Sequence, residues 1–143
     1  MAHERVLLVD DEADFVTVLK ERLSARGLDV TTAGSGPEAV EEVRKKRFDA
    51  VILDYNMPGM DGIETLKSIV ALDKEVQVIL LTGHATARTG ADAIKHGAAD
   101  FLEKPADLPD LLAKIGDAAA RRMSLVEEHS ADRIEDILKK RGW

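Results

Sequence analysis

Val6-Leu7-Leu8-Val9-Asp10-Asp11 is a short apolar run that stops at two acidic residues, and this pattern indicates the class of sheet that the chain forms. It returns at Ala50-Val51-Ile52-Leu53-Asp54, where the run stops at one aspartate. Apolar runs of about 4–8 residues without polar alternation are typical of strands that are buried on both faces. Both stretches therefore predict strands in the interior of a parallel sheet.

Three further runs predict strands, and the amphipathic segments around them predict helices. Asp14 and the capping-box pattern Ser35-Gly36-Pro37-Glu38 indicate helix N-termini. Gly90 makes the fourth helix the least helix-favouring of the set, because glycine costs about 1 kcal/mol relative to alanine in a helix interior. Five β-α units in succession predict a parallel sheet with helices on both faces and right-handed crossovers. The remaining strands are expected at 28–31, 76–81 and 99–102, and the helices at 14–26, 35–43, 63–70, 86–96 and 107–119.

The composition limits the class of protein. A length of 143 residues suits one domain plus a short extra element. The net charge of −7 argues against binding to nucleic acid or anionic membranes, because both need a basic surface. Cysteine is absent, which excludes disulfide scaffolds and thiolate zinc sites, and no run approaches the about 20 apolar residues of a membrane span. We therefore expect a cytoplasmic domain that contacts neither nucleic acid nor membrane directly.

Polar residues stand where the strands end. Asp10 and Asp11 follow the first strand, Asp54 the third and Thr82 the fourth, and Lys104 lies just past the fifth. With strand order 2-1-3-4-5, the order reverses between the first and third strands, which is where ligands bind in such sheets. Adjacent strands lie about 4.8 Å apart, so the three aspartates become near neighbours. The long side chain of Lys104 can span the about two strand spacings to Asp54.

Three carboxylates at one place repel one another. Two of them at about 4 Å in an effective dielectric of about 20 oppose each other by about 4 kcal/mol. An oxygen-only donor set with open positions favours Mg²⁺ that awaits a phosphate oxygen. Asp54 is the natural nucleophile because it is central, and aspartyl-phosphates form where a metal and a cation offset the developing charge. Lys104 and Thr82 could contact other phosphoryl oxygens.

Taken together, these segments resemble the receiver domain of bacterial two-component response regulators over about residues 4–122. The resemblance implies a flavodoxin-like, doubly wound five-stranded fold and a signalling switch of a two-component system or phosphorelay, not an enzyme. Its partners would be a sensor histidine kinase or phosphotransfer protein and a downstream protein target. The matching segments are Val9-Asp10-Asp11-Glu12, Leu53-Asp54-Tyr55-Asn56-Met57-Pro58-Gly59-Met60-Asp61-Gly62, Leu81-Thr82-Gly83 and Phe101-Leu102-Glu103-Lys104-Pro105.

The resemblance also implies the chemistry at the acidic residues. Asp54 would accept a phosphoryl group from a phosphohistidine of the kinase, with Lys104 beside it. Mg²⁺ would be held by Asp54, by Asp11 directly, by Asp10 through water and by the backbone carbonyl of Asn56.

A second group of residues would carry the response. By the same resemblance, Thr82 would swing toward the phosphoryl group and Phe101 would turn inward, which changes the face around residues 82–105. The peptide bond between Lys104 and Pro105 would be cis. His84 stands at a position that the family uses to tune the lifetime of the acyl phosphate.

Two other classes of function compete with this interpretation. Mg²⁺-dependent phosphatases of the haloacid dehalogenase kind also use an aspartate nucleophile, but their Asp-x-Asp motif needs an acid/base where this chain has Asn56, which cannot transfer a proton. A docking module that works without phosphorylation would not need Asp10, Asp11, Asp54, Thr82 and Lys104 together. Multiple turnover on phosphate monoesters would support the first alternative, and an Asp54→Ala strain with a wild-type phenotype the second.

The chain after the receiver-like part is charged. We divide it into a receiver domain at 1–123 and a helical tail at 124–143, with a helix expected at 131–141. Ile134, Ile137 and Leu138 form a narrow apolar stripe there, so the tail should pack on its own domain or on a second copy, which makes a homodimer possible. No output domain is recognisable, so a stand-alone regulator is expected.

Overall fold

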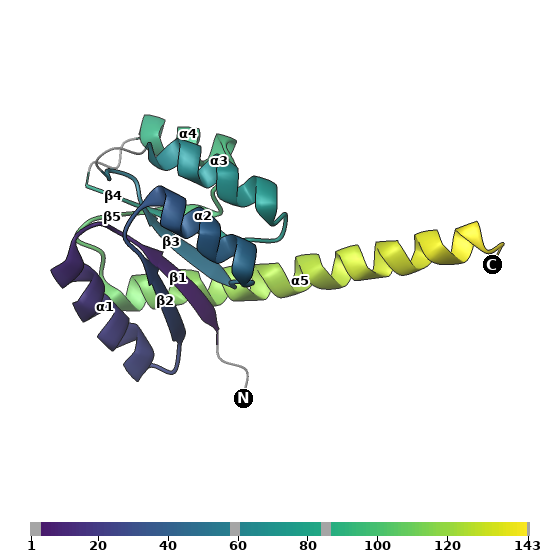
Figure 1. Ribbon diagram of the computed structural model, residues 1–143, viewed down its shortest axis with the longest axis horizontal. Helices are drawn as coiled ribbons and strands as arrows, with labels where there is room; N and C mark the ends of the chain where they lie inside the picture. The colour runs from purple at the N-terminus through teal and green to yellow at the C-terminus, as the bar shows by residue number, and fades with distance from the viewer. Residues whose placement is uncertain (1–3, 58–60, 84–86, 143) are drawn as a thin grey trace.

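Strands and helices alternate along the whole chain. The computed structural model describes residues 4–57, 61–83 and 87–142. The strands are β1 (Arg5–Val9), β2 (Asp29–Ala33), β3 (Ala50–Asp54), β4 (Val78–Thr82) and β5 (Asp100–Glu103). The helices are α1 (Ala13–Ala25), α2 (Gly36–Lys45), α3 (Gly62–Leu72), α4 (Ala87–Lys95) and α5 (Leu108–Lys140), as Figure 1 shows.

The five strands form one parallel sheet with the order β2-β1-β3-β4-β5. This order confirms the predicted one and places β1 beside β3. Val9 pairs with Leu53, and Asp54 pairs with Leu81, so the strands end level with one another. The residues that follow β1, β3, β4 and β5 therefore meet at one edge of the sheet.

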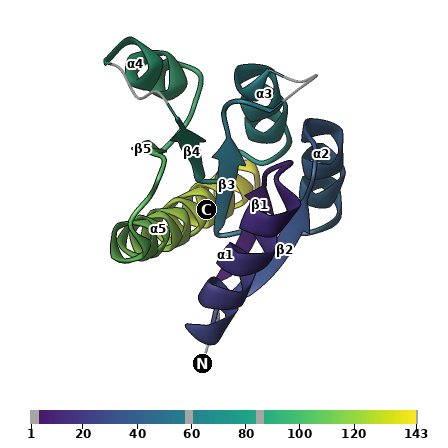
Figure 2. The ribbon, with the colours of Figure 1, turned by 90° about the vertical axis from the view of Figure 1, so that its left-hand side faces the viewer.

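Each face of the sheet is covered by its own set of helices (Figure 2). Leu7 and Val9 of β1 face a core shared with α2, α3 and α4. Val6 and Leu8 face a second core shared with α1 and α5. Successive residues of a strand point to opposite faces, so strands that are apolar throughout are buried on both sides, as their sequence predicts.

One of the two predicted helix N-caps differs from the observed one, and Ser35 is confirmed as the N-cap of α2. The N-cap of α1 is Glu12, and Asp14 lies inside the first turn, so the prediction that Asp14 caps this helix was wrong by two residues. At α2, the hydroxyl of Ser35 accepts a hydrogen bond from the Glu38 amide at 3.3 Å. The Glu38 carboxylate accepts from the amide of Gly34, at 2.8 Å, which is one residue before the position expected for a capping box.

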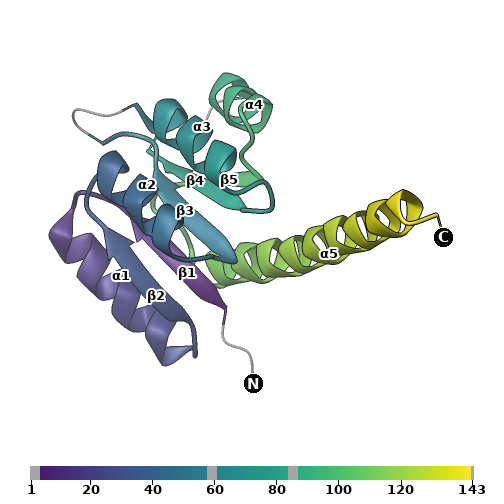
Figure 3. The same ribbon diagram turned by 45° about the vertical axis from the view of Figure 1, so that its right-hand side comes forward.

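The C-terminal region is one long helix. Instead of a helix that ends near residue 119 and another at 131–141, α5 continues without a break to Lys140 and extends beyond the sheet (Figures 1 and 3). No glycine or proline interrupts residues 117–140, and alanines 118–120 favour the helix. No helix in the described ranges combines the length and apolarity that crossing a membrane requires.

A buried ion pair fixes α5 to the loop after α3. Asp73 is 2% exposed and its carboxylate accepts a hydrogen bond from Arg122 at 2.9 Å, while Arg47 lies 3.4 Å from the same oxygen. The other oxygen accepts from the Glu75 amide at 3.1 Å. Burial alone would raise the pKa of Asp73, but the hydrogen bond and charge of Arg122 outweigh it and hold that pKa below its ordinary value.

Some expectations fall outside the described residues. These are His3, the loop residues Pro58 and Gly59, His84 and the predicted start of the fourth helix at Thr86.

The Arg122 ion pair leads to a prediction about stability. We expect Arg122→Met to lower the free energy of unfolding at pH 7 by about 3 kcal/mol, because it leaves Asp73 buried with the more distant Arg47. The contribution of a carboxylate with a lowered pKa is present above the ordinary value of about 3.9 and is lost as the pH falls through the lowered one. Urea unfolding of the two proteins should therefore converge in acid, and the double variant Asp73→Asn/Arg122→Met should recover part of the loss. An equal loss at every pH would contradict this assignment.

Candidate functional site

The sheet brings the predicted site residues to its carboxyl edge. Asp10 directly follows β1, Asp54 is the last residue of β3, Thr82 is the last of β4, and Lys104 directly follows β5. Since parallel strands end at the same edge, residues up to 94 positions apart in sequence come into contact there.

Three carboxylates converge at this edge. One oxygen from each of Asp10, Asp11 and Asp54 lies within 4.8 Å of the other two. Asp10 and Asp54 are buried, at 2% and 3% exposure, and Asp11 is exposed. The cluster is therefore anchored in the fold and also reachable from solution.

Lys104 contacts two of the three carboxylates. Its ammonium nitrogen lies 3.0 Å from an Asp10 oxygen and 3.4 Å from an Asp54 oxygen. The same nitrogen lies 5.0 Å from the centre of the Phe15 ring, a cation–π distance. The long side chain thus spans from the end of β5 past β4, as predicted.

Backbone groups hold the carboxylates in place. The Glu12 amide donates to Asp10 at 2.9 Å, and the Asn56 amide donates to Asp54 at 3.1 Å. At the other side, the Lys104 amide donates to the carbonyl of Thr82 at 2.7 Å. The bond between Lys104 and Pro105 is cis, as the resemblance implies.

The charges at this edge do not balance. Burial raises the pKa of Asp54, and the negative charge of Asp10 raises it further, while the Asn56 amide and Lys104 oppose this shift. Burial alone would lower the pKa of Lys104, but its contacts with Asp10 and Asp54 raise it above its ordinary value. Among the described residues, Lys104 is the one cation in ion-pair contact with the three-carboxylate cluster, so negative charge remains in excess there.

The donor set fits a hard divalent cation. Carboxylate oxygens are the ligands of Mg²⁺, which binds through one or two of them and keeps open positions for waters or phosphate oxygens. Asp10, Asp11 and Asp54 supply such oxygens at one place. Asn56, whose backbone carbonyl is the fourth predicted ligand, directly follows Tyr55 in the loop after β3 and has an exposed side chain.

Thr82 and Phe101 lie on the elements that flank the cluster. Thr82 is buried at the end of β4, at 2% exposure, and Phe101 is half-buried on β5 against the core shared with α2, α3 and α4. Their predicted movements remain predictions.

Sequence reasoning missed the role of Gly90. A side-chain carbon added at Gly90 would lie 2.4 Å and 2.5 Å from atoms of the Phe101 ring, so the ring occupies the space that only glycine leaves free. The sequence did show a helix-weakening glycine inside α4. It did not show that Phe101 faces this glycine. The place of Phe15 under Lys104 had no sequence signal.

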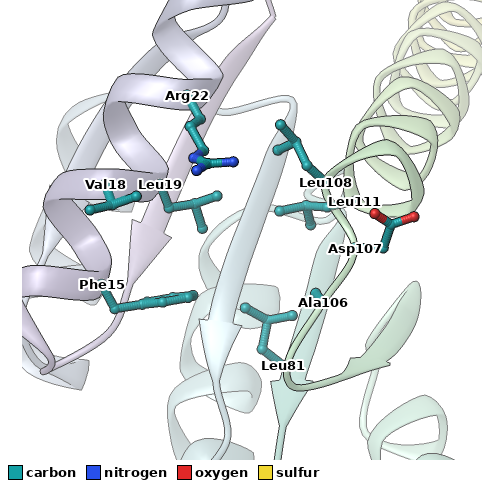
Figure 4. Close-up of a pocket in the computed structure, with 9 residues that line it drawn as sticks. All are labelled: Phe15, Val18, Leu19, Arg22, Leu81, Ala106, Asp107, Leu108 and Leu111. Carbon is teal, nitrogen blue, oxygen red and sulfur yellow. The ribbon is translucent and has the colours of Figure 1, made fainter.

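An apolar groove of about 370 Å³ lies between α1 and α5, next to this edge. Figure 4 shows Phe15 and Leu19 of α1 opposite Leu108 and Leu111 of α5. Phe15 belongs both to the groove and to the contact with Lys104, so the groove adjoins the acidic cluster.

Comparisons with known proteins agree with this geometry. The response regulator receiver domain model matches residues 6–116. The transcriptional regulatory protein ZraR of Escherichia coli K12 is 39% identical over 133 residues, which cover 92% of this chain and 30% of ZraR. The chain thus spans less than a third of the length of that relative.

Solved structures show the same fold. The CheY-like receiver domain protein of Methanospirillum hungatei superimposes with a TM-score of 0.81 at 26% identity, covering 86% of this chain and 98% of the other. The chemotaxis protein CheY4 of Vibrio cholerae gives a TM-score of 0.77 at 31% identity, covering 82% and 99%.

The contact between Gly90 and Phe101 can be tested by adding one methyl group. In most helix interiors Gly→Ala raises stability by about 1 kcal/mol, but we expect Gly90→Ala to lower the free energy of unfolding by about 1–3 kcal/mol because it forces the Phe101 ring aside. Urea unfolding measures the change, and Gly116→Ala in α5, where an added carbon meets nothing within 4 Å, is the matched control that should stabilise. Stabilisation by both substitutions would contradict the packing.

Proposed function

Because this chain belongs to the response regulator receiver family, a class of phosphorylation-activated signalling domains, we propose that Asp54 is its phosphoacceptor. The observation that supports this most strongly is the convergence of Asp10, Asp11, Asp54 and Lys104 at the carboxyl edge of the sheet, where β1 and β3 end side by side. In the proposed reaction an Asp54 oxygen attacks phosphorus, the nitrogen–phosphorus bond of a phosphohistidine breaks, and its electron pair returns to the imidazole.

The neighbours of Asp54 suit it to this role. The Asn56 amide and the Lys104 ammonium contact the same Asp54 oxygen, which orients the carboxylate. The transferred phosphoryl group brings further negative charge to a site that is already acidic. Lys104 would then redistribute its contacts from Asp10 and Asp54 to a phosphoryl oxygen.

We propose that Asp10, Asp11, Asp54 and the backbone carbonyl of Asn56 hold Mg²⁺. The cation would neutralise the carboxylates and the incoming phosphoryl oxygens. Asp11 is exposed, so a cation arriving from solution could contact Asp11 first and then the buried Asp10 and Asp54.

The response to phosphorylation would run through Thr82 and Phe101. Thr82 is the last residue of β4, and its carbonyl accepts a hydrogen bond from the Lys104 amide. This bond links the end of β4 directly to the residue that follows β5. Phe101 belongs to β5, and its ring packs against Gly90 of α4. A movement of either side chain would reshape the face at residues 82–105, which a protein target could read.

The partners follow from the surface next to the site. We propose that a sensor histidine kinase or phosphotransfer protein supplies the phosphoryl group and packs a helix in the groove between α1 and α5, which borders the Lys104 site through Phe15. The domain would act as a phosphoacceptor that catalyses its own phosphoryl transfer and slow dephosphorylation, not as a general enzyme.

The remaining proposals concern location and domain limits. We propose a cytoplasmic domain, and the net charge of −7 argues against contact between its own residues and nucleic acid. We assign residues 1–123 to the receiver domain and 124–143 to a C-terminal helical tail, because the buried residues of α5 end at Arg122.

Phosphorylation by a small-molecule donor tests the chemistry directly. After incubation with acetyl phosphate and Mg²⁺, intact-mass spectrometry should show one added phosphoryl group on the wild-type chain and none on Asp54→Ala. Asp49→Ala, directly before β3 at the opposite end of that strand from the cluster, is the control that should still be modified. Lys104→Met should lower the initial rate of modification more than tenfold, which corresponds to a rise of about 1.4 kcal/mol or more in the activation free energy. Equal modification of wild type and Asp54→Ala would contradict the proposed role of Asp54.

A further inference from the structure

Lys104 reaches the acidic cluster with a long and flexible side chain. Its ammonium nitrogen lies 3.0 Å from an Asp10 oxygen and 3.4 Å from an Asp54 oxygen, and the side chain is 22% exposed. A lysine carries its charge on a flexible four-carbon stem, so the contacts of the ammonium group decide where it sits. Both of these carboxylate contacts would change in the proposed phosphoryl transfer. A third partner that stays the same during the reaction would keep the ammonium in place.

The ring of Phe15 is such a partner. The Lys104 nitrogen lies over this ring, 5.0 Å from its centre, which is within the about 6 Å of a cation–π contact. The negative face of an aromatic ring attracts an ammonium group. The ring carries no charge and forms no bond in the proposed reaction, so phosphorylation would leave it chemically unchanged. An aliphatic side chain at the same place would fill the space without attracting the cation.

The fold holds this ring in position. Phe15 lies in the first turn of α1 and packs, half-buried, against the core shared with α1 and α5. Figure 4 shows its side chain extending from α1 toward Leu81 and Ala106, which line the groove together with it. Leu81 is 1% exposed in β4, so the ring faces a fixed part of the sheet. The ring is therefore a more rigid support for the ammonium than a solvated side chain.

We propose that Phe15 is a positioning residue for Lys104. The ring holds the ammonium beside Asp54 before the phosphoryl group arrives, and it keeps the ammonium there while carboxylate contacts are exchanged for a phosphoryl oxygen. This inference rests on the proposed phosphoryl transfer to Asp54. It assigns to the aromatic character of Phe15 an effect on the rate of that transfer, in addition to ordinary apolar packing.

Phe48 offers a matched control for the ring of Phe15. It is 2% exposed and packs in the core shared with α2, α3 and α4, on the other face of the sheet. A change to its ring alters an aromatic side chain of the same kind without touching the contact with Lys104.

Stepwise fluorination of the Phe15 ring tests the attraction with little change of shape, because fluorine draws electron density from the ring face. Mono-, di- and trifluorophenylalanine are incorporated in place of Phe15, and intact-mass spectrometry gives the initial rate of modification by acetyl phosphate and Mg²⁺. We expect the rate to fall with each fluorine, by about threefold or more in total. The same series at Phe48 should leave the rate unchanged. In Lys104→Met, which has no ammonium for the ring to hold, the Phe15 series should also have no effect.

Proton NMR of the unmodified chain gives a readout that does not depend on phosphoryl transfer. The ring current of Phe15 should shift the Lys104 methylene protons beside the ammonium upfield in wild type, and this shift should be lost in Phe15→Leu, which keeps an apolar side chain.

The two measurements separate the proposals. The positioning role alone would be overturned by the absence of the upfield shift in wild type, by a rate that does not depend on fluorination at Phe15, or by an equal fall of the rate in Lys104→Met. A wild-type chain that acquires no phosphoryl group would overturn the proposed role of Asp54, and the positioning role with it.

Discussion

An excess of negative charge at the carboxyl edge of the sheet is the constraint on which this structure depends. Asp10 and Asp54 are held at the ends of buried strands, and Asp11 adds a third carboxylate within 4.8 Å. Two such charges at about 4 Å oppose each other by about 4 kcal/mol at an effective dielectric of about 20. Lys104 offsets part of this repulsion through contacts at 3.0 and 3.4 Å, and the proposed Mg²⁺ would offset more of it.

The rest of the fold makes this crowding stable. The apolar strands β1 and β3 are buried on both faces, so their ends cannot move apart without opening two cores. A folded domain can keep an energetically unfavourable group of side chains in place when the surrounding packing fixes their positions. Such groups commonly occur at functional sites. The same edge connects through the Thr82 carbonyl to Lys104, and through β5 to Phe101 and Gly90, and these contacts are the route that we propose for the response to phosphorylation.

The strands and most of the site could be predicted from the sequence because short local patterns indicate them. The apolar runs located the strands to within about two residues, and the acidic and basic residues that end them identified the site once the strands were taken as parallel. The prediction for Asp14 was wrong because several acidic residues compete for the start of α1, and the sequence does not show which of them is the N-cap. The break predicted in the tail was wrong because polar residues between apolar ones do not interrupt a helix that faces water.

What the sequence could not show were contacts between distant segments. Arg122 and Asp73 are 49 positions apart, and each alone is typical of a solvated surface residue. Gly90 weakened the predicted helix, yet its reason is the Phe101 ring on another element. Phe15 was predicted as an apolar helix residue, while its place beside Lys104 depends on how α1 packs against the sheet.

The decisive measurement is whether Mg²⁺ raises the free energy of unfolding of this chain. A cation that binds the folded chain and not the unfolded one raises the free energy of unfolding by about 1.4 kcal/mol for each tenfold increase in its concentration above the dissociation constant. We expect this rise for the wild-type chain in urea unfolding and a much smaller one for Asp11→Asn, at constant ionic strength. Equal slopes for the two proteins, or no slope for wild type, would contradict the claim that these carboxylates gather to hold a cation.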